Sequence, residues 1–277
     1  MIMNDNGIIQ GRSEERLTLR VRSLEPYSSE FTAEQIGVVA DVAEQYGSGS
    51  VHVTSRQTIE IPHIDRSHLK DITGLLNKCG LYTGSSGRHL RNVITCSRWC
   101  LYNAVPMSDC AQKLNALFHE KTLPAKTNIS LSGCAFSCVR SRTSDIGVIA
   151  RAEAVVTDKK CKQCSLCVKA PLGCQVDAIE LTEEGVTIDH DKCIRCGFCS
   201  NVCKPDSIMA RSRGFDILVG GKGGLKPKEA VQHKTVSSEE ELIRTIGLLL
   251  DRYAAIAMDG ERLGDVIERC GIRELEV

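Results

Sequence analysis

The chain lacks an excess of charge of either sign and lacks a long apolar run. Its 277 residues include 35 Lys and Arg and 35 Asp and Glu, so the formal net charge is zero at pH 7. A nucleic-acid-binding protein needs a basic footprint for phosphates, which this balance does not provide. The most apolar window, 246–258, contains Asp251 and Arg252 and falls short of the roughly 20 apolar residues of a membrane span. We therefore expect no nucleic-acid partner and no membrane span.

A signal peptide is also missing from the sequence pattern. Residues 1–12 carry Asn4, Asp5 and Asn6 where a signal peptide needs an apolar run. We therefore expect a cytoplasmic protein. In that reducing compartment cysteines serve metal sites or catalysis rather than disulfides.

Cysteine is abundant, with 15 residues, and eight of them fall into two runs. The second run is Cys193-x2-Cys196-x2-Cys199-x3-Cys203, the spacing of bacterial ferredoxins, in which three thiolates hold one [4Fe-4S] cluster and the fourth reaches to another. The first run, Cys161-x2-Cys164-x2-Cys167, repeats the spacing 32 residues earlier and closes at Cys174 after six residues rather than three.

The two runs predict two clusters with exchanged fourth ligands. One set is Cys161, Cys164, Cys167 and Cys203, and the other is Cys193, Cys196, Cys199 and Cys174. Zinc is the alternative, because paired thiolates at this spacing also form zinc sites. Three successive thiolates followed by a fourth, with no paired histidines nearby, favour iron–sulfur clusters.

Seven cysteines remain. Cys96-x3-Cys100 and Cys134-x3-Cys138 form two tight pairs whose four thiolates could close one more cluster. The other three lie at helical spacing from apolar residues, so we interpret them as helix-face residues rather than reactive thiols. They are Cys79, Cys110 and Cys270.

The first 80 residues show the order β-α-β-β-α of a ferredoxin-like half-domain. The first helix is predicted to begin with a capping box at Thr32–Gln35 and to end at Gly47. The strand over Thr58–Ile61 is expected to end at Pro62. The remaining elements are a strand at Leu17–Arg22, a strand at Val51–Thr54 and a helix at Ser67–Cys79.

The rest of the chain indicates a second domain with an insertion, so the predicted fold class is α+β. A helix over Ser108–His119 and a strand over Thr127–Ser132 precede the insertion; a strand at Phe215–Val219 and a helix from Ser238 follow it. The glycine cluster Gly220–Gly224 suits a phosphate cradle and a flexible loop equally well. We expect a half-domain at 1–80, a second domain at 81–153 and 208–277, and an inserted two-cluster ferredoxin at 154–207.

In this order the motifs resemble the siroheme/[4Fe-4S] sulfite and nitrite reductase family. The sequence is most similar to small anaerobic or dissimilatory sulfite reductase subunits with an inserted ferredoxin. The motifs that carry the resemblance are Val53-Thr54-Ser55-Arg56-Gln57, Arg91-Asn92-Val93-Ile94-Thr95-Cys96, Ser132-Gly133-Cys134-x3-Cys138, Val219-Gly220-Gly221-Lys222 and Gly260-Glu261-Arg262-Leu263-Gly264.

The resemblance implies siroheme and three [4Fe-4S] clusters as cofactors. The third cluster would be held by Cys96, Cys100, Cys134 and Cys138, with Cys138 also bridging to the siroheme iron. Arg56, Arg91 and Lys126 would line the face on which sulfite is reduced to sulfide, or nitrite to ammonia, by six electrons.

Siroheme carries eight carboxylates, so its pocket must gather cationic and polar donors. Basic residues are concentrated around the first cysteine pair, after the second pair and in the glycine cluster. The predicted siroheme contacts besides Cys138 are Gln57, Arg88, Asn92, Arg98, Arg140 and Lys222.

The sequence departs from the family pattern at three places. Three residues instead of five separate Cys96 from Cys100, Ala135-Phe136 stands where Pro-Asn is usual, and Asn128 stands where a second lysine is usual. The chain also contains one copy of a module that larger members carry twice. A homo-oligomer or a hetero-complex is therefore expected.

The expected partners are sulfite, preferred over nitrite, and an electron-donor protein or a flavin or iron–sulfur subunit. A donor is needed because no flavin or nicotinamide fingerprint is present. Two alternatives stay open: a non-catalytic iron–sulfur electron-transfer subunit without siroheme, and a tetrapyrrole-binding protein that acts on another substrate.

Overall fold

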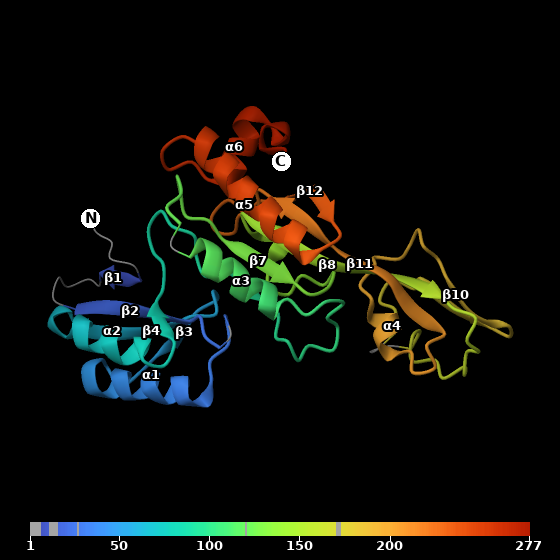
Figure 1. Ribbon diagram of the computed structural model, residues 1–277, viewed down its shortest axis with the longest axis horizontal. Helices are drawn as coiled ribbons and strands as arrows, with labels where there is room; N and C mark the ends of the chain where they lie inside the picture. Colours follow the sequence, from blue (N-terminus) through green and yellow to red (C-terminus); the bar gives the residue numbers. More distant parts are fainter. Residues whose placement is uncertain (1–6, 11–15, 27, 120, 170–172) are drawn as a thin grey trace.

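The computed structural model describes residues 7–10, 16–26, 28–119, 121–169 and 173–277. These residues form two sheet-and-helix units and a smaller lobe, which lies at one end of the long axis (Figure 1). The expectation that residues 1–12 contain no signal peptide concerns a segment that lies largely outside the described residues. None of the helices in the described ranges is long and apolar enough to cross a membrane.

The first unit is an antiparallel sheet with two helices packed on it. Its strand order is β1-β2-β4-β3, and β5 pairs with the free part of β2. Helices α1 and α2 contact each other, β4 and β5. The elements are β1 Ile8–Gln10, β2 Arg16–Ser23, α1 Ala33–Tyr46, β3 His52–Val53, β4 Ile59–Asp65, α2 Leu69–Asn77 and β5 Leu81–Thr83.

Local signals account for the start and the end of α1. The Thr32 side chain accepts a hydrogen bond from the Gln35 backbone, and the Gln35 side chain accepts one from the Thr32 backbone, which completes the predicted capping box. The helix ends at Gly47 as expected, and its Val39, Val42 and Ala43 side chains are buried against the sheet.

One strand boundary was wrong. The strand expected to end at Pro62 continues as β4 to Asp65. The reason is a bulge: Leu17 pairs with Ile64 and Leu19 with Ile61, so Pro62 lies where the ladder between β2 and β4 is interrupted. At such a position the missing N–H of proline removes no ladder hydrogen bond.

The second unit is a mixed five-stranded sheet of order β12-β11-β8-β7-β6. Strands β6, β7 and β8 run parallel, while β11 is antiparallel to both β8 and β12. Helices α3, α5 and α6 share one buried core with this sheet. The elements are β6 Ile94–Thr95, α3 Ser108–Phe118, β7 Ile129–Ser132, β8 Ile146–Val156, β11 Ile208–Val219, β12 Val231–Val236, α5 Glu239–Ile256 and α6 Leu263–Cys270.

The three remaining cysteines differ in burial. Cys110 is 1% exposed within the core of the second unit, and Cys79 packs against the core of the first. Cys270 is exposed, contrary to the helix-face prediction, because it is the last residue of α6 and the chain turns away at Gly271. Leu117, which lies seven positions after Cys110 on α3, is also exposed.

The lobe is the segment between β8 and β11. These two strands pair along their whole length, and the chain leaves the sheet after Val156 and re-enters it at Ile208. The lobe contains the hairpin of β9 Ile179–Thr182 and β10 Gly185–Ile188 and the short helix α4 Phe198–Val202. Cysteine side chains form much of its small core, together with Val186 and Ile208.

The capping box yields a stability prediction. Thr32→Ala should lower the free energy of unfolding by about 1 kcal/mol, because the backbone N–H of Gln35 loses its acceptor. Gly37→Ala is the matched control on the same helix, where an added methyl group meets no atom within 4 Å. It should stabilise by roughly 0.5–1 kcal/mol. Thermal unfolding followed by circular dichroism measures both shifts, and equal shifts in one direction would contradict the capping role.

Candidate functional site

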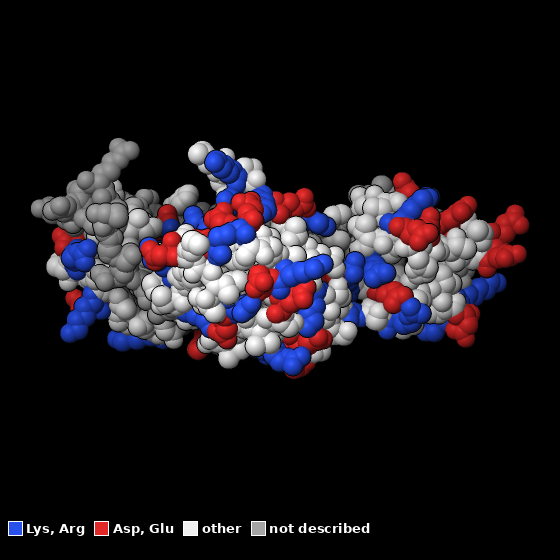
Figure 2. All heavy atoms as spheres, turned by 90° about the horizontal axis from the view of Figure 1, so that it is seen from above, with Lys and Arg blue, Asp and Glu red and all other residues white. Residues whose placement is uncertain are grey.

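A cavity of about 280 Å³ lies where the turn between β3 and β4 faces the second sheet. Four of its lining side chains are cationic and none is acidic. This concentration is local, since lysine and arginine are interspersed with acidic residues over the face of the molecule in Figure 2. The cationic lining residues are Arg56, Lys126, Arg140 and Arg262.

The cations around the cavity repel one another. Burial lowers the pKa of Lys126, and the charges of Arg262, Arg56 and Arg91 lower it further. Burial also lowers the pKa of Arg56, with the charge of Arg20 acting in the same direction. Within the described residues neither Lys126 nor Arg56 forms an ion pair. The arrangement therefore favours an anion in the cavity.

Arg91 is not among the residues that line the cavity, but its charge acts on Lys126, and only 9% of its surface is exposed. One terminal nitrogen donates to the Gly87 carbonyl at 3.0 Å, while Nε and the other terminal nitrogen are buried without a hydrogen-bond partner. Burial lowers the pKa of Arg91 to about 10, and the charges of Arg56 and Arg20 contribute. Unsatisfied donors of a buried guanidinium are costly, which points to an anionic acceptor.

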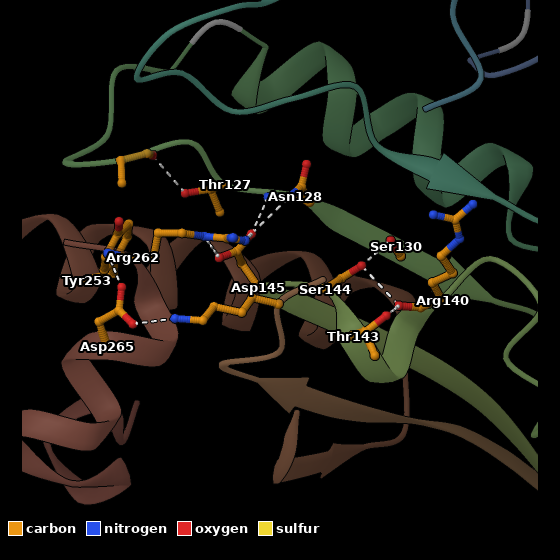
Figure 3. Close-up of polar contacts among 12 residues, drawn as sticks. Thr127, Asn128, Ser130, Arg140, Thr143, Ser144, Asp145, Tyr253, Arg262 and Asp265 are labelled. Atoms are coloured by element: carbon orange, nitrogen blue, oxygen red, sulfur yellow. Dashed lines mark hydrogen bonds and ion pairs between the residues drawn. The ribbon is translucent and has the colours of Figure 1, made fainter. Parts of the chain in front are cut away.

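A buried carboxylate fixes one wall of the cavity (Figure 3). Asp145 is 1% exposed and accepts two hydrogen bonds from Arg262, at 3.0 and 2.6 Å. It also accepts from the backbone and the side chain of Asn128, at 2.9 and 3.1 Å. Asn128 and Arg262 are thus held side by side on the cavity wall, so the N-cap residue of α6 places a cation beside the asparagine that stands where the family usually has a lysine.

Serine hydroxyls hold the segment that carries Arg140. Ser144 Oγ bonds to Ser130 Oγ at 2.6 Å and donates to the Arg140 carbonyl at 3.1 Å (Figure 3). Arg140 has a φ of 65°, a left-handed conformation that costs energy in a non-glycine residue. Gly147 allows this segment to pack closely against β8, because a Cβ at residue 147 would lie 1.9 Å from the Ser141 carbonyl oxygen.

Gln57 and Asn92 connect the two units beside the cavity. Gln57 donates to the Thr95 carbonyl at 2.7 Å and accepts from the Thr95 backbone at 3.0 Å. Asn92 donates to the Arg56 carbonyl at 3.0 Å, and its side-chain oxygen is buried without a partner. Asn92 lines the cavity, whereas the Gln57 amide is occupied in holding the Arg56 turn against β6.

Three of the predicted siroheme contacts do not line the cavity, and each forms an ion pair with a carboxylate. Arg88 forms an exposed ion pair with Asp259. Arg98 pairs with Glu30 at 3.1 Å. Lys222 pairs with Asp265 at 2.8 Å, and the cavity is instead lined by its neighbours Gly223 and Gly224.

The two cysteine pairs come together next to the cavity. Burial, with smaller contributions in the same direction from the thiols of Cys96, Cys100 and Cys138, raises the pKa of Cys134 to about 11, so the four thiols lie near one another. Cys138 is exposed and lies two residues before Arg140. The chain therefore leads within two residues from the fourth thiol to a residue that lines the cavity.

The lobe brings its eight cysteines together in two sets, each around a mainly apolar cavity. One cavity is lined by Cys161, Cys164, Cys167 and Cys203. The other is lined by Cys174, Cys193, Cys196 and Cys199. Within the described residues no three His, Cys, Asp or Glu side chains are grouped so as to hold a single metal ion. The thiols instead surround a space, as a cluster several atoms across requires.

Backbone N–H groups approach the sulfurs in the same way in both sets. Gln163 and Arg195, both with positive φ, donate to Cys161 and Cys193, each at 3.4 Å. In each set a second N–H approaches the fourth cysteine, Cys174 or Cys203, at 3.3 Å. Such N–H···S contacts tune the reduction potential of iron–sulfur clusters.

Sequence comparison assigns this architecture to a family. Residues 86–276 match the nitrite and sulphite reductase 4Fe-4S domain, and residues 9–79 match the nitrite/sulfite reductase ferredoxin-like half domain. The chain belongs to the nitrite and sulfite reductase family. It is related to dissimilatory and anaerobic sulfite reductases.

Individual relatives differ in how much of their length the chain covers. It is 32% identical over 259 residues to an uncharacterized protein of Methanocaldococcus jannaschii, covering 93% of this chain and 89% of that protein. It is 31% identical to the coenzyme F420-dependent sulfite reductase of the same organism, covering 96% of this chain but only 43% of the relative. The crystal structure of dissimilatory sulfite reductase I superposes with a TM-score of 0.76 at 21% identity, covering 94% of this chain and 68% of that one.

Two residues at the cavity were not predicted from the sequence as site residues. Arg262 was noted only as part of a motif, and Asp145 was not singled out at all. Their pairing spans 117 positions, so no local pattern reveals it. The sequence contains one indication of each: Asp145 is a charged residue directly before the apolar strand β8, and Arg262 lies inside a family motif.

The Arg262–Asp145 pair supports a stability prediction. Arg262→Ala should destabilise the protein by about 3 kcal/mol, because it leaves the buried Asp145 carboxylate without its cation. Burial already raises the pKa of Asp145, so its charge is disfavoured in the fold. Stability tied to a raised pKa is present at low pH and lost as pH rises. The deficit of Arg262→Ala should therefore be larger at neutral than at mildly acidic pH.

Arg88→Ala is the matched control, because its ion pair with Asp259 is exposed and contributes less than about 1 kcal/mol. Chemical denaturation at two pH values measures both variants. Equal losses for Arg262→Ala and Arg88→Ala, or a deficit that does not change with pH, would contradict the role of Asp145.

Proposed function

We propose that the protein is a siroheme-dependent reductase of a small oxyanion, sulfite in preference to nitrite. The observation that carries the proposal is a cavity lined by four cations and no acid, next to four clustered thiols. The cations suit both the carboxylates of siroheme and the charge of the substrate. The coenzyme F420-dependent sulfite reductase among the relatives supports sulfite as the substrate.

The residues present fit siroheme coupled to a [4Fe-4S] cluster. Arg140, Arg262 and the Asn92 amide would hold its carboxylates, with the backbone of Gly223 and Gly224 close by. Cys138, which is exposed and lies two residues before Arg140, would hold the cluster together with Cys96, Cys100 and Cys134 and link it to the siroheme. When bound, siroheme supplies the iron at which six electrons reach the substrate.

The protein side chains bind the oxyanion and deliver protons. Arg56 and Arg91 are cations held without a carboxylate partner in the described structure, so their guanidinium groups are available to substrate oxygens. Lys126 is a candidate proton donor, because burial and three neighbouring cations lower its pKa. A lowered pKa makes an ammonium group a better acid near neutral pH. Protonated substrate oxygens can then leave as water.

We further propose that residues 154–207 are an inserted two-cluster ferredoxin within a host domain at 81–153 and 208–277, with residues 1–80 as the half-domain. The paired return of the chain from β8 into β11 supports the insertion. The two cysteine-lined cavities support one [4Fe-4S] cluster each. With the cluster beside the cavity, the protein would hold three.

The protein needs an electron donor and, we propose, a second subunit. No dinucleotide fingerprint is present, so electrons come from another protein or from a flavin or iron–sulfur subunit. Trp99 and Leu101 are 79% and 73% exposed in the loop that carries Cys100. Apolar side chains beside a cofactor site suit contact with a second copy or a partner subunit.

Arg91→Ala tests the substrate face. The variant should keep the absorption bands of the cofactors but lose roughly 10²-fold or more of the turnover with reduced viologen and sulfite, because one donor to the developing charge is removed. Arg91→Lys should restore part of the activity. Arg244→Ala, an exposed arginine on α5, is the control and should be fully active. Unchanged turnover in Arg91→Ala would show that the oxyanion binds elsewhere.

Cys174→Ser tests the exchange of fourth ligands. The loss of Cys174 should remove the cluster of Cys193, Cys196 and Cys199, about four iron atoms per chain, although Cys174 belongs to the first run in the sequence. Cys203→Ser should instead remove the cluster of Cys161, Cys164 and Cys167. Cys270→Ser is the control and should keep all iron. Iron analysis with EPR of each reduced variant identifies the missing cluster, and the opposite assignment would refute the exchange.

A further inference from the structure

The lobe contacts the host domain through its second cysteine run. The Ala152 backbone donates to the Arg195 carbonyl at 2.9 Å, and Ala152 forms a β-bridge with Cys196. The Asn201 side chain donates to the Asn103 carbonyl at 3.0 Å. These contacts join the Cys193–Cys203 run to the middle of β8 and to the loop that follows Cys100.

The first cysteine run makes its described side-chain contacts within the lobe. The Gln163 amide donates to the carbonyl of Thr182 in the β9–β10 hairpin at 2.9 Å. Lys159, just before the run, pairs with Asp206 at 2.8 Å. Cys164 is exposed. The two cluster sites of the lobe therefore differ: one is next to the host domain, and the other faces outward.

Gly197 shows how closely the second run approaches the host domain. A Cβ at Gly197 would lie 2.7 Å from the Ala152 Cβ and 3.1 Å from the Ala104 Cβ. Its φ of 75° is also unfavourable for other residues. Only glycine allows the loop between Cys196 and Cys199 to lie directly against β8 and the segment after Cys100.

Three aromatic rings fill the junction. The Tyr102 and Phe198 rings lie 4.5 Å apart between centroids at an angle of 30°, and the Phe136 ring contacts Tyr102 edge-on at 5.3 Å. Each ring belongs to a residue within two positions of a proposed cluster ligand. Phe198 precedes Cys199, Tyr102 follows Cys100 by two residues, and Phe136 lies midway between Cys134 and Cys138.

We propose that this aromatic contact is the route by which electrons pass from the lobe into the reductase site, and that it fixes the order of the clusters. The cluster of Cys174, Cys193, Cys196 and Cys199 is the inner one, and that of Cys161, Cys164, Cys167 and Cys203 is the outer one, which receives electrons from the donor. Tyr102, Phe136 and Phe198 are positioning residues for the transfer. The inference rests on the proposed function, because it requires the third cluster.

The transfer balances as a one-electron step. One electron leaves the reduced inner cluster, which returns to its oxidised state, and the cluster held by Cys96, Cys100, Cys134 and Cys138 gains that electron. No bond forms or breaks. A low-potential one-electron donor replaces the electron through the outer cluster. Because tunnelling rates fall steeply with distance, the cluster that touches the host domain carries this step.

The order can be tested magnetically in the intact protein. Dipolar broadening between two reduced clusters falls with the cube of their distance, so the EPR signal of the third cluster should be broadened mainly by the inner one. Cys174→Ser should remove that broadening, whereas Cys203→Ser should leave it. The reverse result would overturn the proposed order. Missing siroheme bands would refute the proposed function alone, while a missing third cluster would refute both.

The aromatic contact is tested by Phe198→Leu, which keeps an apolar side chain but removes the ring. All clusters should remain by iron analysis, and reduction of the third cluster should slow several-fold in freeze-quench EPR after mixing with dithionite. Tyr46→Leu is the matched control, because it removes an aromatic contact with His68 in the first unit. It should leave the rate unchanged. An unchanged rate in Phe198→Leu, or equal slowing in both variants, would refute the route.

Discussion

The structure depends on a group of neighbouring cations that form no ion pair within the described residues: Arg91 is buried, Arg56 is half-buried and Lys126 is exposed. Arg91 is almost fully buried with two unsatisfied nitrogens, and Arg56 and Arg91 lie close enough to Lys126 to lower its pKa. An unpaired buried charge costs several kcal/mol, which an anionic occupant can offset. Two of the surrounding segments bring a cation to the cavity: a turn of the first sheet carries Arg56, and the serine-bonded segment before β8 carries the exposed Arg140.

The same arrangement explains why the two units and the lobe are joined as they are. Gln57 and Asn92 bond the Arg56 turn to the β6 region, so the cavity is formed by both units and neither would form it alone. The long pairing of β8 with β11 holds the lobe by two continuous strands rather than by a flexible linker. The proposed relay would need this rigidity to pass single electrons over fixed distances, and the close contact at Gly197 adds to it.

The sequence predicted those features that depend on local patterns. A capping box located the start of α1, and cysteine spacing predicted the sets of four thiols that the lobe brings together. It failed where partners are distant. Arg88 and Lys222 looked like free cations, but Asp259 and Asp265 pair with them. Pro62 looked like a strand end, because the bulge that accommodates it arises from the pairing of β4 with β2, which is distant in the sequence.

The account requires siroheme, and the most direct test is the absorption spectrum of protein purified anaerobically from cells that make siroheme. The predicted result is the bands of siroheme together with the broad absorption of iron–sulfur clusters, in about one siroheme per chain or per assembled site. Sulfite added to the oxidised or reduced protein should shift the siroheme bands. Protein that contains the clusters but shows no siroheme bands would contradict the account and would identify the chain as an electron-transfer subunit.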